Sequence, residues 1–122
     1  MFLSEITTSD QLMLALARQG YGKVSAHERP EYPLNGIYAL QEFTCACCGE
    51  HNTSVTIIPP GFVEYGDACL DAYINQDGTI DRWQLWARFD DTIHRLDPAT
   101  VEVGQIGPAI DDWLSHIEQE VD

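Results

Sequence analysis

The chain has 122 residues, 44% of them hydrophobic, which suffices for one domain with an apolar core. Twenty acidic residues stand against six basic ones, for a formal net charge of −14. A surface this negative repels nucleic acid and anionic lipid, so the composition argues against direct binding of either. No apolar run approaches the ~18 residues that a membrane-spanning helix requires. The sequence therefore predicts a single domain over residues 1–122 that acts in solution.

The first predicted element is a helix over residues 8–19. Thr8 offers a hydroxyl and Gln11 an amide three residues later, the spacing of a capping box, and apolar residues then recur at helical intervals until Gly20. The stretch 21–36 is rich in glycine and proline, so we expect a loop there.

The most concentrated chemistry lies in residues 45–51, which read Cys-Ala-Cys-Cys-Gly-Glu-His. Cys45 and Cys48 stand at the C-x-x-C interval by which one tight turn aims two sulfurs at one ion, and Gly49 accepts the positive φ of such a turn. Thiolate and imidazole are the ligands that select zinc. Strands are predicted on both sides, at 37–44 and 53–59, so the cluster is expected at the tip of a hairpin.

A closed structural zinc site takes four ligands, and we predict Cys45, Cys48, Cys69 and His51. Cys69 follows Cys48 after twenty residues, enough for the chain to run out along a strand and return. Cys47 is the alternative to His51, although adjacent residues of an extended chain point to opposite sides. With Phe43 two residues before the first cysteine, the pattern resembles the zinc-knuckle hairpin of zinc ribbons and treble-clef fingers. The resemblance implies that the Zn²⁺ is structural.

The cysteines have a second interpretation, as reduced thiols that pack like small apolar residues. The N-terminus, Met-Phe-Leu-Ser-Glu, lacks the basic start and apolar core of a secretion signal. We therefore expect a cytoplasmic protein whose thiols stay reduced.

Residues 66–90 have two interpretations. Asp77-Gly78 between apolar runs favours a hairpin with a type I′ turn, and the following residues alternate as a strand would, from Trp83 to Phe89. A helix is the alternative, because Leu70, Tyr73 and Ile74 also fall on one helical face.

The C-terminal segment predicts an amphipathic helix beginning near Pro108. One face is apolar and comprises Ile110, Trp113, Leu114, Ile117 and Val121. The opposite face has no cation, and its acids are the predicted partner-binding residues Asp111, Asp112, Glu118 and Asp122. It serves either as a solvated face that keeps the protein soluble or as a contact surface for a basic partner.

Together these elements predict an α+β domain, an antiparallel sheet with a zinc-knuckle-like hairpin and N- and C-terminal helices. No catalytic signature is present, and the nearest approach to a nucleophile pair is Cys69 with His94 or His116. The predicted function is a small, acidic, non-enzymatic protein-interaction module whose partner has a basic surface. Inhibitors of nucleic-acid-binding machines, such as those that phages and plasmids direct at restriction or CRISPR complexes, have this composition. The alternatives are a zinc-stabilised adaptor or regulatory domain of a larger complex and a small metal-dependent enzyme.

Overall fold

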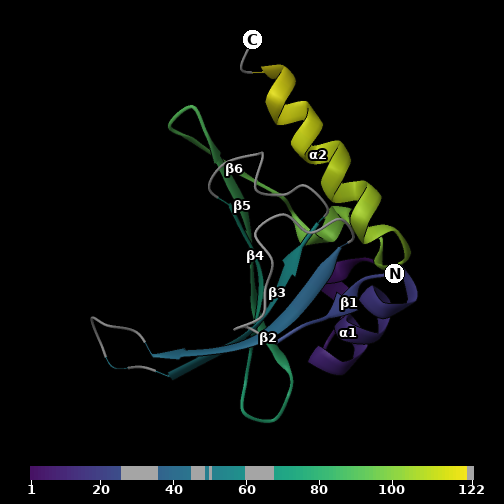
Figure 1. Cartoon of the computed structure of the whole chain (residues 1–122), viewed down its shortest axis with the longest axis vertical. Coiled ribbons are helices and arrows are strands. Elements are labelled where there is room, and N and C mark those ends of the chain that lie inside the picture. The colour runs from purple at the N-terminus through teal and green to yellow at the C-terminus, as the bar shows by residue number, and fades with distance from the viewer. Residues whose placement is uncertain (26–35, 45–48, 50, 60–67, 121–122) are drawn as a thin grey trace.

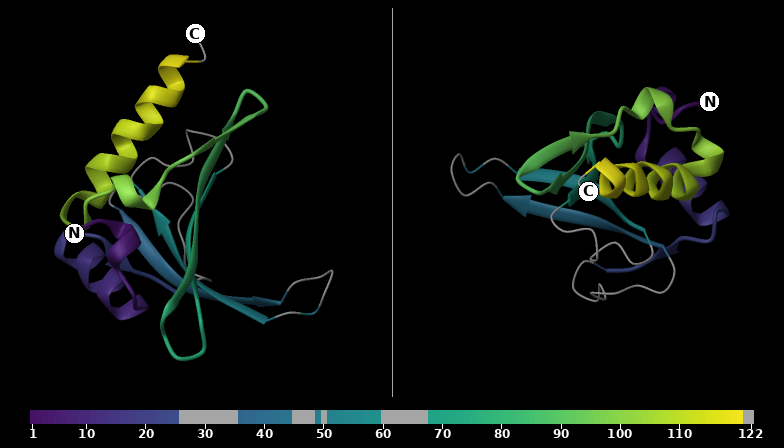
Figure 2. Two further views of the ribbon diagram at one scale, coloured as in Figure 1. Left: turned by 180° about the vertical axis from the view of Figure 1, so that it is seen from behind. Right: turned by 90° about the horizontal axis from the view of Figure 1, so that it is seen from above.

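A computed structural model describes residues 1–25, 36–44, 49, 51–59 and 68–120, without the side chains of Phe43 and Glu118–Glu120. Six strands form one sheet in the order β1 to β6, and two α-helices lie on one side of it (Figures 1 and 2). The strands are β1 (Gly22–Lys23), β2 (Ile37–Thr44), β3 (His51–Ile58), β4 (Ala68–Ile74), β5 (Ile80–Phe89) and β6 (Thr92–Arg95). The α-helices are α1 (Ser9–Arg18) and α2 (Ile106–Glu120), and the 3₁₀ turns are η1 (Leu3–Glu5), η4 (Pro98–Thr100) and η5 (Val103–Gln105).

The α+β class is confirmed, but the sheet is mixed rather than antiparallel. The four pairings from β2 to β6 are antiparallel, whereas β1 pairs with β2 in parallel. The two-residue β1 lies in a stretch expected to be only a loop, and a strand with two paired residues is too short to show a periodic sequence pattern. Among the described residues, no helix is long and apolar enough to cross a membrane.

The first helix begins and ends within one residue of its predicted bounds. The Thr8 hydroxyl accepts a hydrogen bond from the Gln11 amide at 3.2 Å, and the Gln11 side chain accepts one from Thr7 N at 3.0 Å. These contacts satisfy amides that have no partner within the helix. Gly20, with φ of +87°, ends the helix in the left-handed conformation that glycine adopts without strain.

Residues 68–89 form the predicted hairpin, and the helical alternative is wrong. The turn type was also predicted wrongly. Gly78 N donates to Asn75 O at 3.0 Å, and Gly78 alone in this turn has a positive φ, of +87°. This is a type I turn followed by a left-handed glycine, the usual three-residue hairpin loop, rather than a two-residue type I′ turn. The Asp77 carboxylate accepts from Thr79 N at 3.0 Å and from the Thr79 hydroxyl, and these bonds lower the pKa of Asp77.

The core lies between the helices and one face of the sheet. Because side chains alternate along a strand, every second residue of β2 to β5 points to the helices. The buried members of this core face are Tyr38, Val55, Ile57, Leu70, Ala72, Leu85 and Ala87. On the helices, α1 contributes Leu12, Ala15 and Leu16, and α2 contributes Ile106, Ile110, Leu114 and Ile117. The apolar stripe predicted for the C-terminal helix is thus confirmed, except that Val121 lies outside the described residues.

The side chain of Gln19 joins the end of α1 to the start of α2. Its amide nitrogen donates to Ala15 O at 3.1 Å and to Val103 O at 2.5 Å, while its oxygen accepts from Ile106 N at 2.8 Å. Ile106 is the first residue of α2, so its amide has no partner within the helix. One half-buried amide group therefore caps the second helix and fixes η5 against the first.

We expect Gln19→Ala to lower the free energy of unfolding by about 2–3 kcal/mol, because Ile106 N and Val103 O would each lose a partner in a half-buried setting. Gln19→Glu should have a free energy of unfolding between those of the parent and Gln19→Ala, since a carboxylate can still accept from Ile106 N but cannot donate to Val103 O. Urea unfolding followed by tryptophan fluorescence measures both. Gln105→Ala, at an exposed glutamine one residue before α2, is the matched control and should change stability by less than about 0.5 kcal/mol. Equal effects at the two positions would contradict the capping role.

Candidate functional site

His51, the predicted imidazole ligand, is the first residue of β3 in the β2–β3 hairpin. Thr44 and His51 are the last residue pair of the two strands before the turn, and His51 Nδ1 lies 3.1 Å from the Thr44 hydroxyl. Gly49 has a φ of +72°, which confirms its predicted left-handed conformation. Cys45, Cys47, Cys48 and Glu50 lie outside the described residues, so the structure does not place the predicted sulfur ligands.

The strand register separates Cys69 from this hairpin tip. Thr56 of β3 pairs with Asp71 of β4, and the two strands run antiparallel. His51 is five positions from Thr56 towards the tip, and Cys69 is two positions from Asp71 in the opposite direction. At about 3.3 Å per residue, the two residues are roughly 20 Å apart along the sheet. A zinc ion with ligand bonds of about 2.0–2.3 Å cannot bind both, which removes Cys69 from the predicted ligand set.

Cys69 instead takes part in a polar network on the sheet face that points away from the helices. Its thiol donates to one carboxylate oxygen of Asp71, and the Thr56 hydroxyl donates to the other. Burial, together with the hydrogen bond and negative charge of Asp71, raises the pKa of Cys69 to about 12. The thiol therefore holds its proton at neutral pH, which is the reverse of what a nucleophile needs.

Neither proposed nucleophile pair has a suitable arrangement. Cys69 pairs across the strands with Trp86, which pairs with Arg95, whereas His94 pairs with Ala87. His94 therefore points to the opposite face of the sheet from Cys69. His116 is an exposed residue of α2, where its Nδ1 donates to Asp112 O at 2.8 Å. Within the described part of the chain, no three His, Cys, Asp or Glu side chains gather as a metal site would require.

The predicted acidic face of α2 is present at the positions that the structure describes. Asp111 and Asp112 are exposed, while the side chains of Ile110 and Leu114 beside them are exposed by 2% or less. Asp112 has a side chain that is 78% exposed, and its Oδ1 lies 3.8 Å from His116 Nδ1. Glu118 belongs to α2, without a described side chain, and Asp122 lies outside the described residues.

The carboxyl group of Asp111 is more constrained by its surroundings than its position on α2 suggests. Partial burial raises the pKa of its carboxyl group, and its charge acts on the nearby Tyr21. The Tyr21 ring packs against Gly36 and Gly107, where an added Cβ would approach ring or hydroxyl atoms to 2.5 and 3.0 Å. The Tyr21 hydroxyl is buried, with no hydrogen-bond partner within the described residues. Burial first, and the Asp111 charge second, raise the pKa of Tyr21 to about 12.

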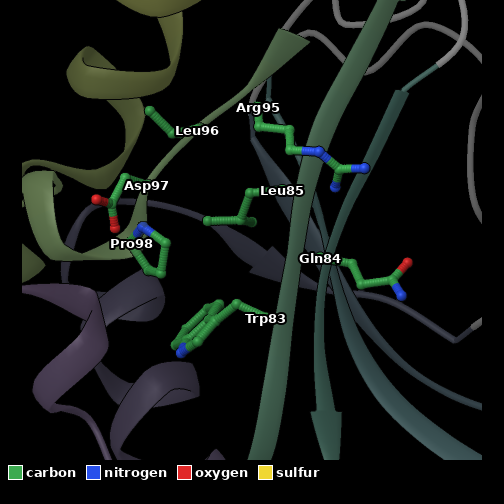
Figure 3. Close-up of a pocket in the computed structure, with 7 residues that line it drawn as sticks. All are labelled: Trp83, Gln84, Leu85, Arg95, Leu96, Asp97 and Pro98. Atoms are coloured by element: carbon green, nitrogen blue, oxygen red, sulfur yellow. The ribbon is translucent and has the colours of Figure 1, made fainter. Parts of the chain in front are cut away.

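The sequence did not predict a pocket that lies beside β5 (Figure 3). It lies between the core-facing side chains Trp83 and Leu85 and the segment Leu96–Pro98. The local signals were present, since Asp97-Pro98 is a typical start for a helical turn and Trp83 falls on the core side of the alternating pattern. What brings them together is the pairing of β5 with β6, a strand that the sequence did not predict.

No protein-family model, curated protein or solved structure matches this chain.

We expect Tyr21→Phe to raise the free energy of unfolding by about 1 kcal/mol at pH 7, because it removes a buried hydroxyl without a partner. The pH dependence has a definite sign. Below pH 10 the tyrosine is protonated in both states, whereas between pH 10 and about 12 only the unfolded state ionises and stability falls. Urea unfolding at pH 7 and pH 11 should therefore show a larger advantage of the variant at pH 11. Tyr38→Phe, at a tyrosine that is also buried in the core, is the control and should not raise the free energy of unfolding in this way.

Proposed function

We propose that this protein is a small, non-enzymatic interaction module whose acidic surface docks onto a Lys/Arg-rich protein surface. The observation that carries the proposal is the division of α2 into two faces. The apolar side of α2 is buried in the core, since its side chains are exposed by 3% or less at Ile106, Ile110, Leu114 and Ile117. The acids on the other side, represented by Asp112, contribute nothing to that packing. An unused acidic face is suited to contact with a cationic partner.

A second acidic feature lies at the turn between β5 and β6. Asp90 and Asp91 have φ values of +52° and +62°, a left-handed conformation that glycine or asparagine would adopt with less strain. Positive φ at both residues is what a two-residue type I′ hairpin turn requires, so this turn presents two adjacent, exposed negative charges. This turn and the C-terminal end of α2 project towards the same end of the molecule (Figures 1 and 2).

The charge distribution favours a partner that itself binds nucleic acid. Fourteen of the twenty acids lie after residue 63, together with only three arginines. Such a field accelerates encounter with a basic groove and opposes binding of a polyanion to this protein itself. The module would then compete with nucleic acid for that groove, as an inhibitor of the phage or plasmid anti-defence type does. A zinc-stabilised adaptor within a larger complex uses the same surface and differs in leaving the partner active.

We expect charge reversal on α2 to slow association with the basic partner. In Asp112→Lys/Glu118→Lys, the attraction is lost while the buried stripe is untouched, so the fold should survive and the association rate at low salt should fall about tenfold or more. The partner is first isolated by retention on the immobilised protein at low salt and release at high salt, and stopped-flow mixing then measures the rates.

The matched control is Glu42→Lys/Asp10→Lys, which makes the same change in net charge at two exposed acids on β2 and α1. If both double variants slow association equally, the partner senses only net charge. If neither variant slows it, the acidic face serves solubility alone and the proposed function is wrong.

We also propose that the β2–β3 hairpin holds a structural zinc ion through Cys45, Cys48 and His51. His51 Nδ1 is engaged with the Thr44 hydroxyl, which orients the ring and leaves Nε2 for a metal. Gly49 provides the left-handed residue that a knuckle turn needs after its second cysteine. Cys47 is the nearest residue in the sequence that would supply a fourth ligand. The ion would fix the tip of the hairpin.

Protein purified without chelator should carry about one equivalent of zinc, which elemental analysis measures. Cys45→Ser should lose the metal, because a C-x-x-C site with one sulfur removed binds poorly. Cys69→Ser is the control that the strand register provides, and it should keep the metal. Unchanged metal content and melting temperature in Cys45→Ser would mean that these cysteines only pack, and loss of zinc in Cys69→Ser would contradict the register argument.

A further inference from the structure

A pocket opens where the chain leaves the sheet after β6. Leu96 N donates to Leu85 O at 2.9 Å, which continues the strand pairing for one more residue, and the chain then turns away at Asp97 and Pro98. The resulting pocket has a volume of about 400 Å³, within the range of about 300–1,000 Å³ that small-ligand sites occupy. Its location beside an edge strand leaves it open to a partner.

The lining is apolar with one carboxylate. Trp83, Leu85, Leu96 and Pro98 supply the walls. Figure 3 shows that Asp97 and Trp83 lie on the same side of β5, whereas the side chains of Gln84 and Arg95 extend to the other side. The guanidinium group of Arg95 thus lies across β5 from Trp83, and the other charged group of the lining is the exposed carboxylate of Asp97, with Pro98 between it and Trp83 in this view.

The Asp97 carboxylate is fixed and still has capacity to bind. Its Oδ1 accepts from Ala99 N at 2.9 Å, which caps η4 and restricts rotation of the side chain. Within the described residues, Oδ2 makes no hydrogen bond. A fixed carboxylate in the lining of a pocket that also contains an indole and aliphatic side chains matches a ligand that is cationic, planar and carried on an apolar stem.

We propose that this pocket binds the side chain of an arginine on the basic partner. A guanidinium group stacks on an indole face and donates charge-assisted hydrogen bonds to a carboxylate, while its methylene stem packs on aliphatic surface. Trp83, Asp97 and Leu85 supply these three contacts. Tryptophan and arginine are also the residues most enriched where a few contacts dominate an interface, usually in a pocket near its centre.

The proposal rests on the proposed function, because it names a contact that the basic partner makes. The segment from Leu96 to Gln105, which contributes Leu96, Asp97 and Pro98 to the pocket, connects β6 to the start of α2 (Figure 1). The two surfaces have different tasks. The acids attract any cation over a distance, and the pocket selects one side chain by its shape.

The experiment uses N-acetyl-L-arginine methylamide as the probe and its citrulline counterpart as a neutral control of the same shape. Each is titrated into ¹⁵N-labelled protein, and the indole N–H signals of the three tryptophans are followed. We expect the arginine probe to shift the Trp83 signal. Trp86 points to the other face of β5 and Trp113 lies on α2, so both serve as internal references. Asp97→Asn, which retains a capping side chain, should weaken binding about tenfold, and Asp112→Asn should not.

A Trp83 signal that stays fixed up to saturating probe would overturn the proposal, as would equal shifts with the citrulline control or unchanged affinity in Asp97→Asn. Failure of the proposed function looks different. If Asp112→Lys/Glu118→Lys slows association with the partner but Asp97→Asn leaves its affinity unchanged, the pocket is not the arginine site and the acidic face still is the docking surface. If arginine binds the pocket while the α2 variant associates at the parent rate, the acidic-face function fails and the pocket stands.

Discussion

The contact on which the arrangement of the elements most depends is the side chain of Gln19. A single amide accepts from the first residue of α2 and donates both to α1 and to the turn before α2, so it sets where the second helix begins. Burial of Ile106, Ile110 and Leu114 then sets the rotation of that helix about its axis. Because the start and the rotation of α2 are fixed, Asp112 faces solvent. The acidic face is thus a consequence of core packing, and its charge is free to vary without loss of the fold.

The alternation of side chains along the strands separates the chemistry of the sheet into two faces. Trp83 and Leu85 point to the helices and form one wall of the pocket, while Cys69 and Asp71 point away and hold each other in a hydrogen-bonded pair. The same register that pairs Thr56 with Asp71 carries Cys69 away from the hairpin tip. The raised thiol pKa of Cys69 fits a packed, protonated group.

Local signals predicted local structure well. The capping residues Thr8 and Gln11, the left-handed Gly49 and the apolar stripe of α2 each depend on neighbours within a few positions, and each is present in the structure. Contacts across the chain were not predictable in this way. The hydrogen bond between Gln19 and Ile106 joins residues that are 87 positions apart, and no local sequence pattern near either residue predicts it. The turn at Asp77-Gly78 shows an intermediate case, because the glycine signalled a hairpin but the choice of turn followed from the hydrogen bond between Asn75 and Gly78.

A net charge alone would give this protein attraction without selectivity. At physiological ionic strength the field of exposed acids decays over a Debye length of about 8 Å, and any basic surface benefits from it equally. Selectivity requires a contact that a wrong partner leaves unsatisfied. An apolar pocket with one fixed carboxylate is such a contact, because a lysine leaves the indole face poorly covered and an acid meets Asp97 with like charge. In the proposed function, the acids of α2 therefore act on the rate of encounter with the basic partner, and the pocket at Trp83 acts on the lifetime of the complex.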